Sequence, residues 1–346
     1  MHPGNRVAGD DEAGAPVPAG ERSRPLPGSG EITICFAHHT YRVAERFASR
    51  NTGIRYVAAA SVGELEDRIG EADVVVVSGL WRNAMLARAH KLRFIQSISA
   101  GVNQYALDVL QARGIRLASG QGTNAHAVAD HAMALILALT RQLHLARDNQ
   151  ARRIWPGMIS DPALREDELG GKTLLIVGLG KIGSRLSRLA RAFDMRVIAI
   201  KRNPASGAGA ADAVFAPDRL LDQLPHADVV ALTCPLTTET ERLIDRKALA
   251  AMKPSGFLVN VARGRIVDET ALVTALEAGR LAGVGLDCVW HEPLPAESRL
   301  WEFERVLITP HRAGETHRNE DSVIDLLLDN LDRLWRGEAE LSNQIL

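Results

Sequence analysis

The chain has 346 residues, of which 46% are hydrophobic and 24% are charged, and its formal net charge at pH 7 is -1. This length has room for two globular domains of roughly 150 residues each. The near-zero net charge provides no basic field for nucleic acid or an anionic membrane, so binding to either is not expected.

The cysteines and the apolar runs further limit the classes of protein to which the chain can belong. Cys35, Cys234 and Cys288 lie far apart, with the spacing of neither a zinc site nor a disulfide framework. We expect buried thiols in a reducing compartment and no bound metal. The densest apolar run, residues 132–140, is much shorter than the roughly 18 residues of a membrane span, so the protein is expected to be cytoplasmic.

The N-terminal residues 1–30 are rich in proline, glycine and charge and contain no signal-sequence core, so they are predicted to form a disordered extension. After them, short β-rich runs alternate with helical stretches, which predicts βαβ units and a parallel sheet. The first strands are predicted within residues 32–37, 72–79, 94–101 and 114–120.

Residues 122–150 are rich in alanine and leucine and predict one long helix before a second set of strands. These later strands are nearly continuous in Val, Ile and Leu, as in strands buried on both faces. The pattern predicts an α/β fold of two doubly wound, Rossmann-like domains. The later strands are predicted within residues 172–180, 195–200, 227–235, 257–262, 283–289 and 305–310, and a final helix within 319–337.

Gly178, Gly180 and Gly183 have GxGxxG spacing between a predicted strand and a predicted helix. The first glycine makes the turn, the second lets a pyrophosphate approach the backbone, and the third lets the helix pack on the strand. Small residues at such a turn can serve packing alone. Because the sequence pattern predicts both the flanking strand and the flanking helix, a dinucleotide site is predicted.

An NAD site of this kind usually has an acidic residue about 20 residues after the glycines. Here Lys201 and Arg202 occupy that place, and Asp194 precedes the strand. Without the acid nothing repels a 2′-phosphate, and arginine offers a planar pair of donors to it. The sequence therefore predicts NADP, with a solvated pair of cations at a strand end as the alternative.

Several segments together resemble the D-isomer-specific 2-hydroxyacid dehydrogenase family over nearly the whole chain after residue 31. Behind GLGKIG come FLVNVARGRIVDETAL, VGLDCVWHEPLP and VLITPHRAG, in the family's order. FIQSISAGVNQ is similar to the family's substrate-carboxylate loop, and AVADHAMALILALTR to its interdomain helix. The resemblance implies a substrate-binding domain (31–126 and 314–346) and a dinucleotide-binding domain (127–313), with the active site in the cleft between them.

Reduction of a 2-keto acid requires a hydride donor, a proton donor and a cation that holds the carboxylate. Arg263, Glu292 and His311 each follow a predicted strand, on the edge where open α/β sheets bind ligands. Arginine can grip a carboxylate with two donors, and a carboxylate beside an imidazole favours its protonated form. The family gives the matching positions the same roles.

The resemblance also implies that Asp287 contacts the nicotinamide amide and that the backbone amides of Ala100, Gly101 and Val102 hold the substrate carboxylate. Trp81 and Arg82 follow a strand and are candidates for side-chain selectivity, while His38 and Trp155 are further possible pocket residues. The cofactor, NADP or NAD, is expected to contact Gly178, Gly180, Lys181, Ile182, Gly183, Lys201, Arg202, Pro235, Ala262 and Asp287.

The predicted function is an NADPH-preferring reductase of the glyoxylate/hydroxypyruvate type, which interconverts 2-keto acids and D-2-hydroxy acids. The alternatives are a phosphoglycerate-type dehydrogenase and a nucleotide-sensing, corepressor-like binding protein of the same fold. The resemblance further implies a homodimer formed through the helix at 127–150.

Overall fold

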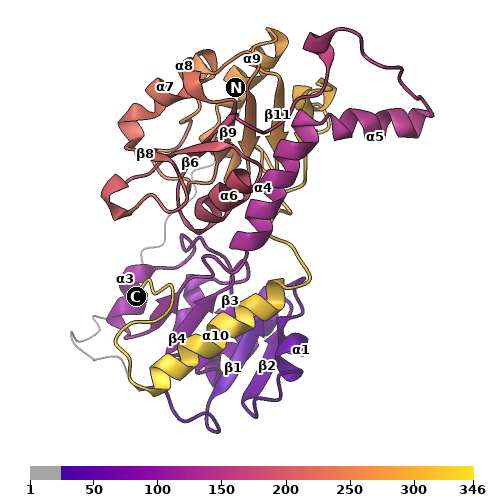
Figure 1. Ribbon diagram of the computed structural model, residues 1–346. Helices are drawn as coiled ribbons and strands as arrows, with labels where there is room; N and C mark the ends of the chain where they lie inside the picture. The colour runs from indigo at the N-terminus through magenta and orange to yellow at the C-terminus, as the bar shows by residue number, and fades with distance from the viewer. Residues whose placement is uncertain (1–24) are drawn as a thin grey trace, which may run out of the picture. The chain divides into compact units, whose positions relative to one another are not determined.

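The computed structural model describes residues 25–346, which form two compact units (Figure 1). Unit 1 contains the described residues up to Gln121 together with Glu320–Leu346, and unit 2 contains Gly122–Asn319. The domain boundaries expected from the sequence, at 126 and 314, lie a few residues from these positions.

Unit 1 is built on a five-stranded parallel sheet with the strand order β2-β1-β3-β4-β5. The chain runs from β1 to one edge and then continues from β3 toward the other, so the sheet is doubly wound. The elements of unit 1 are β1 (Thr33–Ala37), α1 (Val43–Ala48), β2 (Arg55–Ala59), α2 (Val62–Arg68), β3 (Val74–Val77), β4 (Phe94–Ser97), α3 (Leu107–Ala112), β5 (Arg116–Ala118) and α10 (Asn319–Trp335).

Alternate side chains of the unit 1 strands enter two cores, one on each face of the sheet. Ile34 and Phe36 of β1 are buried on the face that α10 covers, together with Val323 and Leu327 of that helix. Cys35 lies between them in sequence and belongs to the opposite core, which includes side chains of α2 and α3. The strand is therefore buried on both sides, as its continuous apolar sequence predicts.

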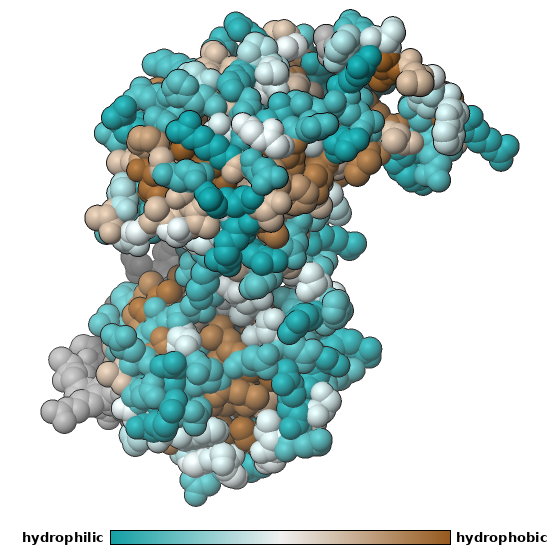
Figure 2. All heavy atoms as spheres, viewed as in Figure 1, coloured by the Kyte–Doolittle hydropathy of each residue, from teal (hydrophilic) through white to brown (hydrophobic). Residues whose placement is uncertain are grey.

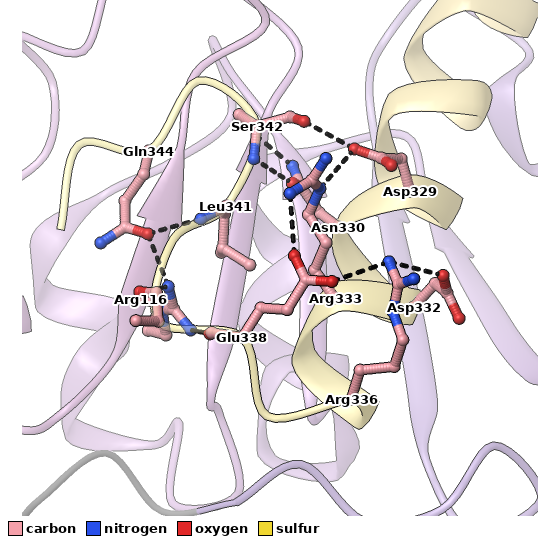
Figure 3. A network of polar contacts seen from close by, with 11 residues as sticks. Arg116, Asp329, Asn330, Asp332, Arg333, Arg336, Glu338, Leu341, Ser342 and Gln344 are labelled. Atoms are coloured by element: carbon pink, nitrogen blue, oxygen red, sulfur yellow. Dashed lines mark hydrogen bonds and ion pairs between the residues drawn. The ribbon is translucent and has the colours of Figure 1, made fainter.

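Hydrogen bonds join α10 and the C-terminal segment to the sheet of unit 1, and an ion pair joins the C-terminal segment to α10 (Figure 3). The fully buried side chain of Asn330 donates to Gln96 Oε1 at 2.9 Å and accepts from the Ser342 N–H at 2.8 Å. Arg116 of β5 donates to Gln344 Oε1 at 2.5 Å. The last helix therefore packs in unit 1, although it follows the last strand of unit 2 in sequence.

Unit 2 is built on a seven-stranded parallel sheet with the order β12-β11-β10-β9-β6-β7-β8. The direction of winding switches between β6 and β9. The elements of unit 2 are α4 (Ala125–Thr140), α5 (Leu143–Arg152), β6 (Thr173–Val177), α6 (Lys181–Ala192), β7 (Arg196–Ile200), β8 (Ala213–Phe215), α7 (Leu220–Gln223), β9 (Val229–Leu232), α8 (Arg246–Ala251), β10 (Phe257–Asn260), α9 (Glu269–Glu277), β11 (Gly283–Leu286) and β12 (Val306–Ile308).

Short 3-10 helices occur in several connections of both units. They are η1 (Ile69–Glu71), η2 (Asn83–Ala87), η3 (Pro162–Leu164), η4 (Pro204–Ser206), η5 (Pro217–Arg219), η6 (Leu224–His226), η7 (Gly264–Ile266) and η8 (Arg299–Glu302).

The segment 122–150 is not the single helix that its composition predicts. α4 ends at Thr140 and α5 begins at Leu143, with Gln142 between them in the left-handed conformation at φ 47°. The Thr140 carbonyl accepts from the N–H of Asp167 at 3.0 Å instead of from a following helical turn. Because no glycine or proline marks this break, the local pattern continues through it.

The two helices differ in burial. α4 packs its apolar side within unit 2, where Leu135 and Leu139 lie against the small glycines Gly283 and Gly285 of β11. Every residue of α5 is described and none is buried. α5 extends away from the body of unit 2 (Figure 1), and its visible face is mainly hydrophilic (Figure 2).

Two strands were not predicted from the sequence, and both lie at sheet edges. β2 is an edge of the unit 1 sheet and β8 an edge of the unit 2 sheet, and both are partly exposed. An edge strand needs no continuous apolar run, so its pattern is weak. The other strands lie within their predicted segments, and the predicted α/β class with parallel, doubly wound sheets is confirmed.

Part of the predicted disordered extension packs on unit 1. The prediction for residues 1–24 lies outside the described residues. In the described part, Leu26 packs against the core under α10, and the Trp335 indole N–H donates to the Pro27 carbonyl at 2.8 Å. Residues 25–30 are therefore ordered by contacts with the C-terminal helix, which lies about 300 positions away in the chain.

Candidate active site

The glycine turn after β6 has the geometry that its spacing predicts. Gly178 has a φ of +105°, and a Cβ there would lie 2.6 Å from the Cys234 backbone nitrogen. A Cβ on Gly183 would lie 2.3 Å from the Gly178 carbonyl oxygen. Gly180 has open space around its Cβ position, so packing within the described chain does not account for a glycine there, whereas backbone approach by a ligand does.

The first turn of α6 follows this glycine turn directly. Gly180 is the N-cap of α6 and provides no side-chain cap. The N-terminus of a helix favours an anion through its backbone N–H groups and its dipole. Thr233, which sequence reasoning missed, donates its hydroxyl to the Gly178 carbonyl at 2.7 Å and braces the turn from β9. These features fit the pyrophosphate of a dinucleotide. Lys181 and Ile182 begin the helix at the same place.

The two cations after β7 have different surroundings. The Lys201 ammonium donates to the Gly207 carbonyl at 3.0 Å and to the Ser206 carbonyl at 3.4 Å, so it is folded onto the following loop. Arg202 is exposed, and its guanidinium has no hydrogen-bond or ion-pair partner among residues 25–346. A hydrogen bond from Thr237 and then the charge of Arg202 help to lower the pKa of Glu239.

Arg263 follows β10 on a turn that a buried amide shapes. The Asn260 side chain donates to the Arg263 carbonyl at 2.9 Å and accepts from the Ala262 N–H at 3.0 Å. The Arg263 guanidinium donates to the Ala262 carbonyl at 2.6 Å, and its other N–H groups have no partner in the described chain. It therefore keeps donors for an anionic ligand. Asn260 is not among the site residues predicted from the sequence. A polar residue within an otherwise apolar, buried strand is the signal that could have identified it.

His311 and Glu292 form the predicted pair. His311 Nδ1 lies 2.6 Å from Glu292 Oε2, after β12 and β11, respectively. Because a carboxylate only accepts hydrogen bonds, the Nδ1 atom carries the proton. No described residue bonds to His311 Nε2. Since β10, β11 and β12 are neighbours in the sheet, Arg263, Glu292 and His311 follow the same carboxyl edge.

Asp287 holds the loop that carries His311. Its buried carboxylate accepts from the Thr309 hydroxyl at 2.7 Å and from the backbone N–H groups of Arg312 and Ala313, each at 3.0 Å. His131 of α4 also reaches Thr309 Oγ1 at 2.9 Å. This structural role was not predicted. The expected contact of Asp287 with the nicotinamide amide stays a prediction.

In unit 1, the loop after β4 exposes consecutive backbone donors. The N–H groups of Ala100, Gly101 and Val102 make no hydrogen bond with any described residue. The loop is stabilised from the other side, because the Ser99 carbonyl accepts from the Gly120 N–H at 2.9 Å and the Ser99 hydroxyl donates to the Gly101 carbonyl. Successive free amides of this kind suit a carboxylate.

The other pocket candidates are placed as follows. Trp81 is 2% exposed and packs against Tyr105 in the core of unit 1, and its role in side-chain selectivity stays a prediction. Arg82 is exposed, and its guanidinium is hydrogen-bonded to backbone carbonyls. His38 accepts at Nδ1 from two backbone N–H groups, and burial together with the neighbouring His39 lowers its pKa to about 4.

Trp155 is 96% exposed after α5. Of the remaining cofactor candidates, Pro235 is exposed after β9, and Ala262 is buried beside Arg263. The expected contacts of both residues with the cofactor stay predictions.

Two surface hollows lie at the amino edges of the sheets, away from these residues. One, of about 350 Å³, is lined by Thr173, Arg196 and Lys253 among others, and another, of about 550 Å³, by Phe47 and Tyr56 among others. Over residues 25–346, no three His, Cys, Asp or Glu side chains gather as metal ligands, and no helix is long and apolar enough to cross a membrane.

Comparison with known proteins agrees with this arrangement. The sequence matches the NAD-binding domain of the D-isomer-specific 2-hydroxyacid dehydrogenases over residues 133–313, just over half of the chain. It is 33% identical to the glyoxylate reductase of Pyrococcus furiosus over 80% of this chain and 83% of that protein.

A second relative is the D-3-phosphoglycerate dehydrogenase of Mycobacterium leprae, 35% identical over 78% of this chain. The chain spans only half the length of that protein. Among solved structures, an NADPH-dependent glyoxylate/hydroxypyruvate reductase from Sinorhizobium meliloti, in complex with NADP and malonate, matches with a TM-score of 0.73 and 27% identity, covering 91% of this chain and 97% of that one. The chain therefore belongs to the D-isomer-specific 2-hydroxyacid dehydrogenase family.

Proposed function

We propose that the protein is an NADPH-preferring 2-keto acid reductase, with glyoxylate or hydroxypyruvate as the substrate. The observation that carries the proposal is the 2.6 Å contact between His311 Nδ1 and Glu292, at the sheet edge where Arg263 keeps free donors. A bound nicotinamide cofactor supplies the hydride in this chemistry. The three buried cysteines suit a reducing cytoplasm.

Each residue of the site has a role in the proposed reaction. Arg263 binds the substrate carboxylate and polarises the keto group, helped by the free amides at Ala100–Val102. His311 donates a proton from Nε2 to the carbonyl oxygen. Glu292 keeps the other ring proton on Nδ1 and stabilises the positive charge of the ring before the transfer.

The chemistry test is turnover of a panel of 2-keto acids with NADPH by the wild type and His311→Gln. General acid catalysis contributes typically about 10²- to 10⁴-fold, so His311→Gln is expected to lose roughly that factor in kcat. His317→Gln, an exposed histidine on the following loop, is the matched control and should keep wild-type turnover. Wild-type protein that turns over no 2-keto acid contradicts the proposed function and favours a binding role.

A phosphoglycerate-type activity is the second candidate, because a D-3-phosphoglycerate dehydrogenase is 35% identical over most of this chain. The same panel separates the two when it includes 3-phosphohydroxypyruvate. A kcat/KM for that phosphorylated substrate at least as high as for glyoxylate or hydroxypyruvate favours the second candidate.

The cofactor preference is proposed to depend on Arg202 more than on Lys201, because only Arg202 lacks a partner in the described chain. A charge-assisted hydrogen bond of about 1.5 to 3 kcal/mol corresponds to roughly 10- to 150-fold tighter binding of NADPH than of NADH. Fluorescence titrations should show that Arg202→Ala removes most of this ratio and Lys201→Ala little of it.

Arg196→Ala is the control for this titration, because Arg196 is an exposed arginine at the opposite end of the same strand. Equal affinity of the wild type for both cofactors overturns the NADPH preference and leaves the reductase proposal standing.

A homodimer is proposed, with its interface shifted from α4 to the segment that follows. α4 is largely buried within unit 2, whereas apolar side chains of residues 143–164 are exposed. Exposed groups of this kind on a projecting segment are typical of a protein interface. These side chains are Leu143, Ile154, Trp155, Met158, Ile159 and Leu164.

A further inference from the structure

Trp290 lies between β11 and Glu292, and two arginines lie against its ring. The Arg242 Cζ atom is 5.0 Å and the Arg265 Cζ atom 5.6 Å from the ring centroid, both within the range of cation–π attraction. The indole is only partly buried. It does not belong to either apolar core of unit 2, and the two guanidinium groups lie against its ring.

The segments that carry the two arginines are joined to each other, and Arg265 forms an ion pair. The Arg242 N–H donates to the Arg265 carbonyl at 2.8 Å, and the Arg265 guanidinium donates to Glu241 Oε1 at 2.6 Å. Arg242 has a φ of 53°, a left-handed conformation that a residue with a Cβ adopts at a free-energy cost. Such a conformation persists only where the surrounding contacts hold it.

A hydrogen bond and a close packing contact also hold the backbone around Trp290. The Trp290 N–H donates to Glu269 Oε2 at 3.2 Å. On the other side the Val289 carbonyl lies so close to Gly264 that a Cβ there would be 1.8 Å from its oxygen. The turn that presents Arg263 and the loop 289–292 are therefore in direct contact, and only glycine at position 264 allows it.

This loop decides where the Glu292 carboxylate lies. The Val289 N–H donates to Glu292 Oε1 at 3.1 Å, and the other oxygen meets His311 Nδ1 at 2.6 Å. The His311 and Glu292 side chains are both exposed to solvent, so burial does not hold the pair together. The geometry of the pair thus depends on the conformation of residues 289–292.

We propose that Trp290 is a positioning residue for catalysis: together with Arg242 and Arg265 it holds the loop 289–292 so that Glu292 stays hydrogen-bonded to His311. The effect on turnover rests on the proposed reductase function, whereas the effect on the hydrogen bond does not. Trp290 touches no reacting group and acts through Glu292.

The turnover test is a double-mutant cycle with Trp290→Leu and Glu292→Gln. Leucine keeps apolar bulk but offers no π face, so Trp290→Leu is expected to lower kcat about tenfold or more, with little change in cofactor affinity. In the Glu292→Gln background the same change should cost almost nothing, because the group through which it acts is gone. Trp290→Phe, which keeps an aromatic face, should retain most activity.

Arg242→Ala with Arg265→Ala is a second variant that leaves the loop sequence intact, and it should lower kcat in the same direction. Trp301→Leu is the matched control: its ring is 54% exposed in the same unit, without a described arginine against it, and kcat should stay at the wild-type value. Wild-type kcat in Trp290→Leu, or an effect that multiplies with that of Glu292→Gln, overturns the proposal.

A readout without turnover separates this proposal from the reductase function. In the cofactor-free protein the hydrogen-bonded Nδ1 proton of His311 should give a low-field NMR signal that His311→Gln assigns. The signal should be lost or broadened in Trp290→Leu and retained in Trp290→Phe and Trp301→Leu. This pattern without 2-keto acid turnover supports the positioning role and contradicts the reductase. An unchanged signal in Trp290→Leu contradicts the positioning role alone.

Discussion

At the scale of single residues, the buried carboxylate of Asp287 stabilises the loop that carries His311. Both of its oxygens accept from the residues around His311, including two backbone N–H groups. His311 itself has a φ of 53°, so the loop that carries it is strained and needs such a brace.

We predict that Asp287→Asn loses both stability and turnover. Asparagine has one acceptor oxygen, so its amide group would face a backbone donor, at a cost of about 1–3 kcal/mol in the free energy of unfolding. Urea unfolding and kcat measure the two losses, and Asp222→Asn, in an exposed ion pair, serves as the control. Wild-type values of both quantities in Asp287→Asn contradict the bracing role.

The three cysteines are predicted to be unreactive in the folded protein. Burial raises the pKa of Cys35 to about 12 and that of Cys234 to about 11, and it also raises the pKa of Cys288. Because these pKa values lie above the working pH, the thiols stay protonated and are poor nucleophiles at pH 8. A thiol-specific disulfide reagent should react with none of them before unfolding and with all three afterwards. Rapid reaction of any of them in native protein contradicts this.

At the scale of elements, the two units share one feature at the amino edges of their sheets. Asp73 before β3 accepts from the Thr33 N–H of β1 at 2.9 Å, and Asp228 before β9 accepts from the Thr173 N–H of β6 at 2.8 Å. Both aspartates lie in the sequence ADVV. Each ties the first strand of its unit to a neighbour on which the winding direction changes.

Asp228→Asn is predicted to destabilise unit 2 in a pH-dependent way. Burial raises the pKa of Asp228, but the hydrogen bonds from Lys253 and from the Thr173 N–H outweigh it, so the net shift is downward. Because the pKa of Asp228 is lowered in the folded state, its ionised carboxylate stabilises the folded protein at neutral pH. This contribution is lost as the pH falls below the ordinary aspartate pKa of about 3.9.

Urea unfolding should therefore show a loss of about 1–3 kcal/mol for Asp228→Asn at pH 7 that shrinks as the pH falls below about 4. Asp218→Asn, an exposed position in the same unit, should change little at either pH. A difference between wild type and Asp228→Asn that is independent of pH contradicts the charged hydrogen-bond account.

At the scale of the whole molecule, the exposed apolar side chains of residues 143–164 are the proposed interface of the homodimer. Trp155 and Met158 are almost fully exposed, and nothing in unit 2 packs over them among the described residues. Introducing charge there, as Trp155→Asp with Met158→Asp, should convert the proposed homodimer into a monomer, because charged groups are costly to bury in an interface.

Light scattering coupled to size-exclusion chromatography measures this change in mass. Trp301→Asp, which adds a charge at an exposed tryptophan outside the segment, should leave the mass unchanged. A wild-type protein that is monomeric at micromolar concentration contradicts the dimer, and a double variant that stays dimeric places the interface elsewhere.

Local sequence pattern is enough to predict much of the fold of this protein. Continuous apolar runs predicted the buried strands, and the GxGxxG spacing predicted the turn at Gly178. Glu292 and His311 follow neighbouring parallel strands, whose carboxyl ends share one edge of the sheet, and they form a hydrogen bond there. Arg263 follows the next strand along the same edge, and its part in the site stays a prediction.

Tertiary structure alone decided the features that depend on contacts between distant residues. The helix break at Gln142 depends on the hydrogen bond from Asp167. The different surroundings of Lys201 and Arg202 depend on the fold of the loop 204–207. The burial of Trp81 depends on its packing against Tyr105. The edge strands β2 and β8 gain their hydrogen bonds from a neighbour, with little apolar pattern of their own. In each case the deciding free energy comes from a partner that local spacing does not reveal.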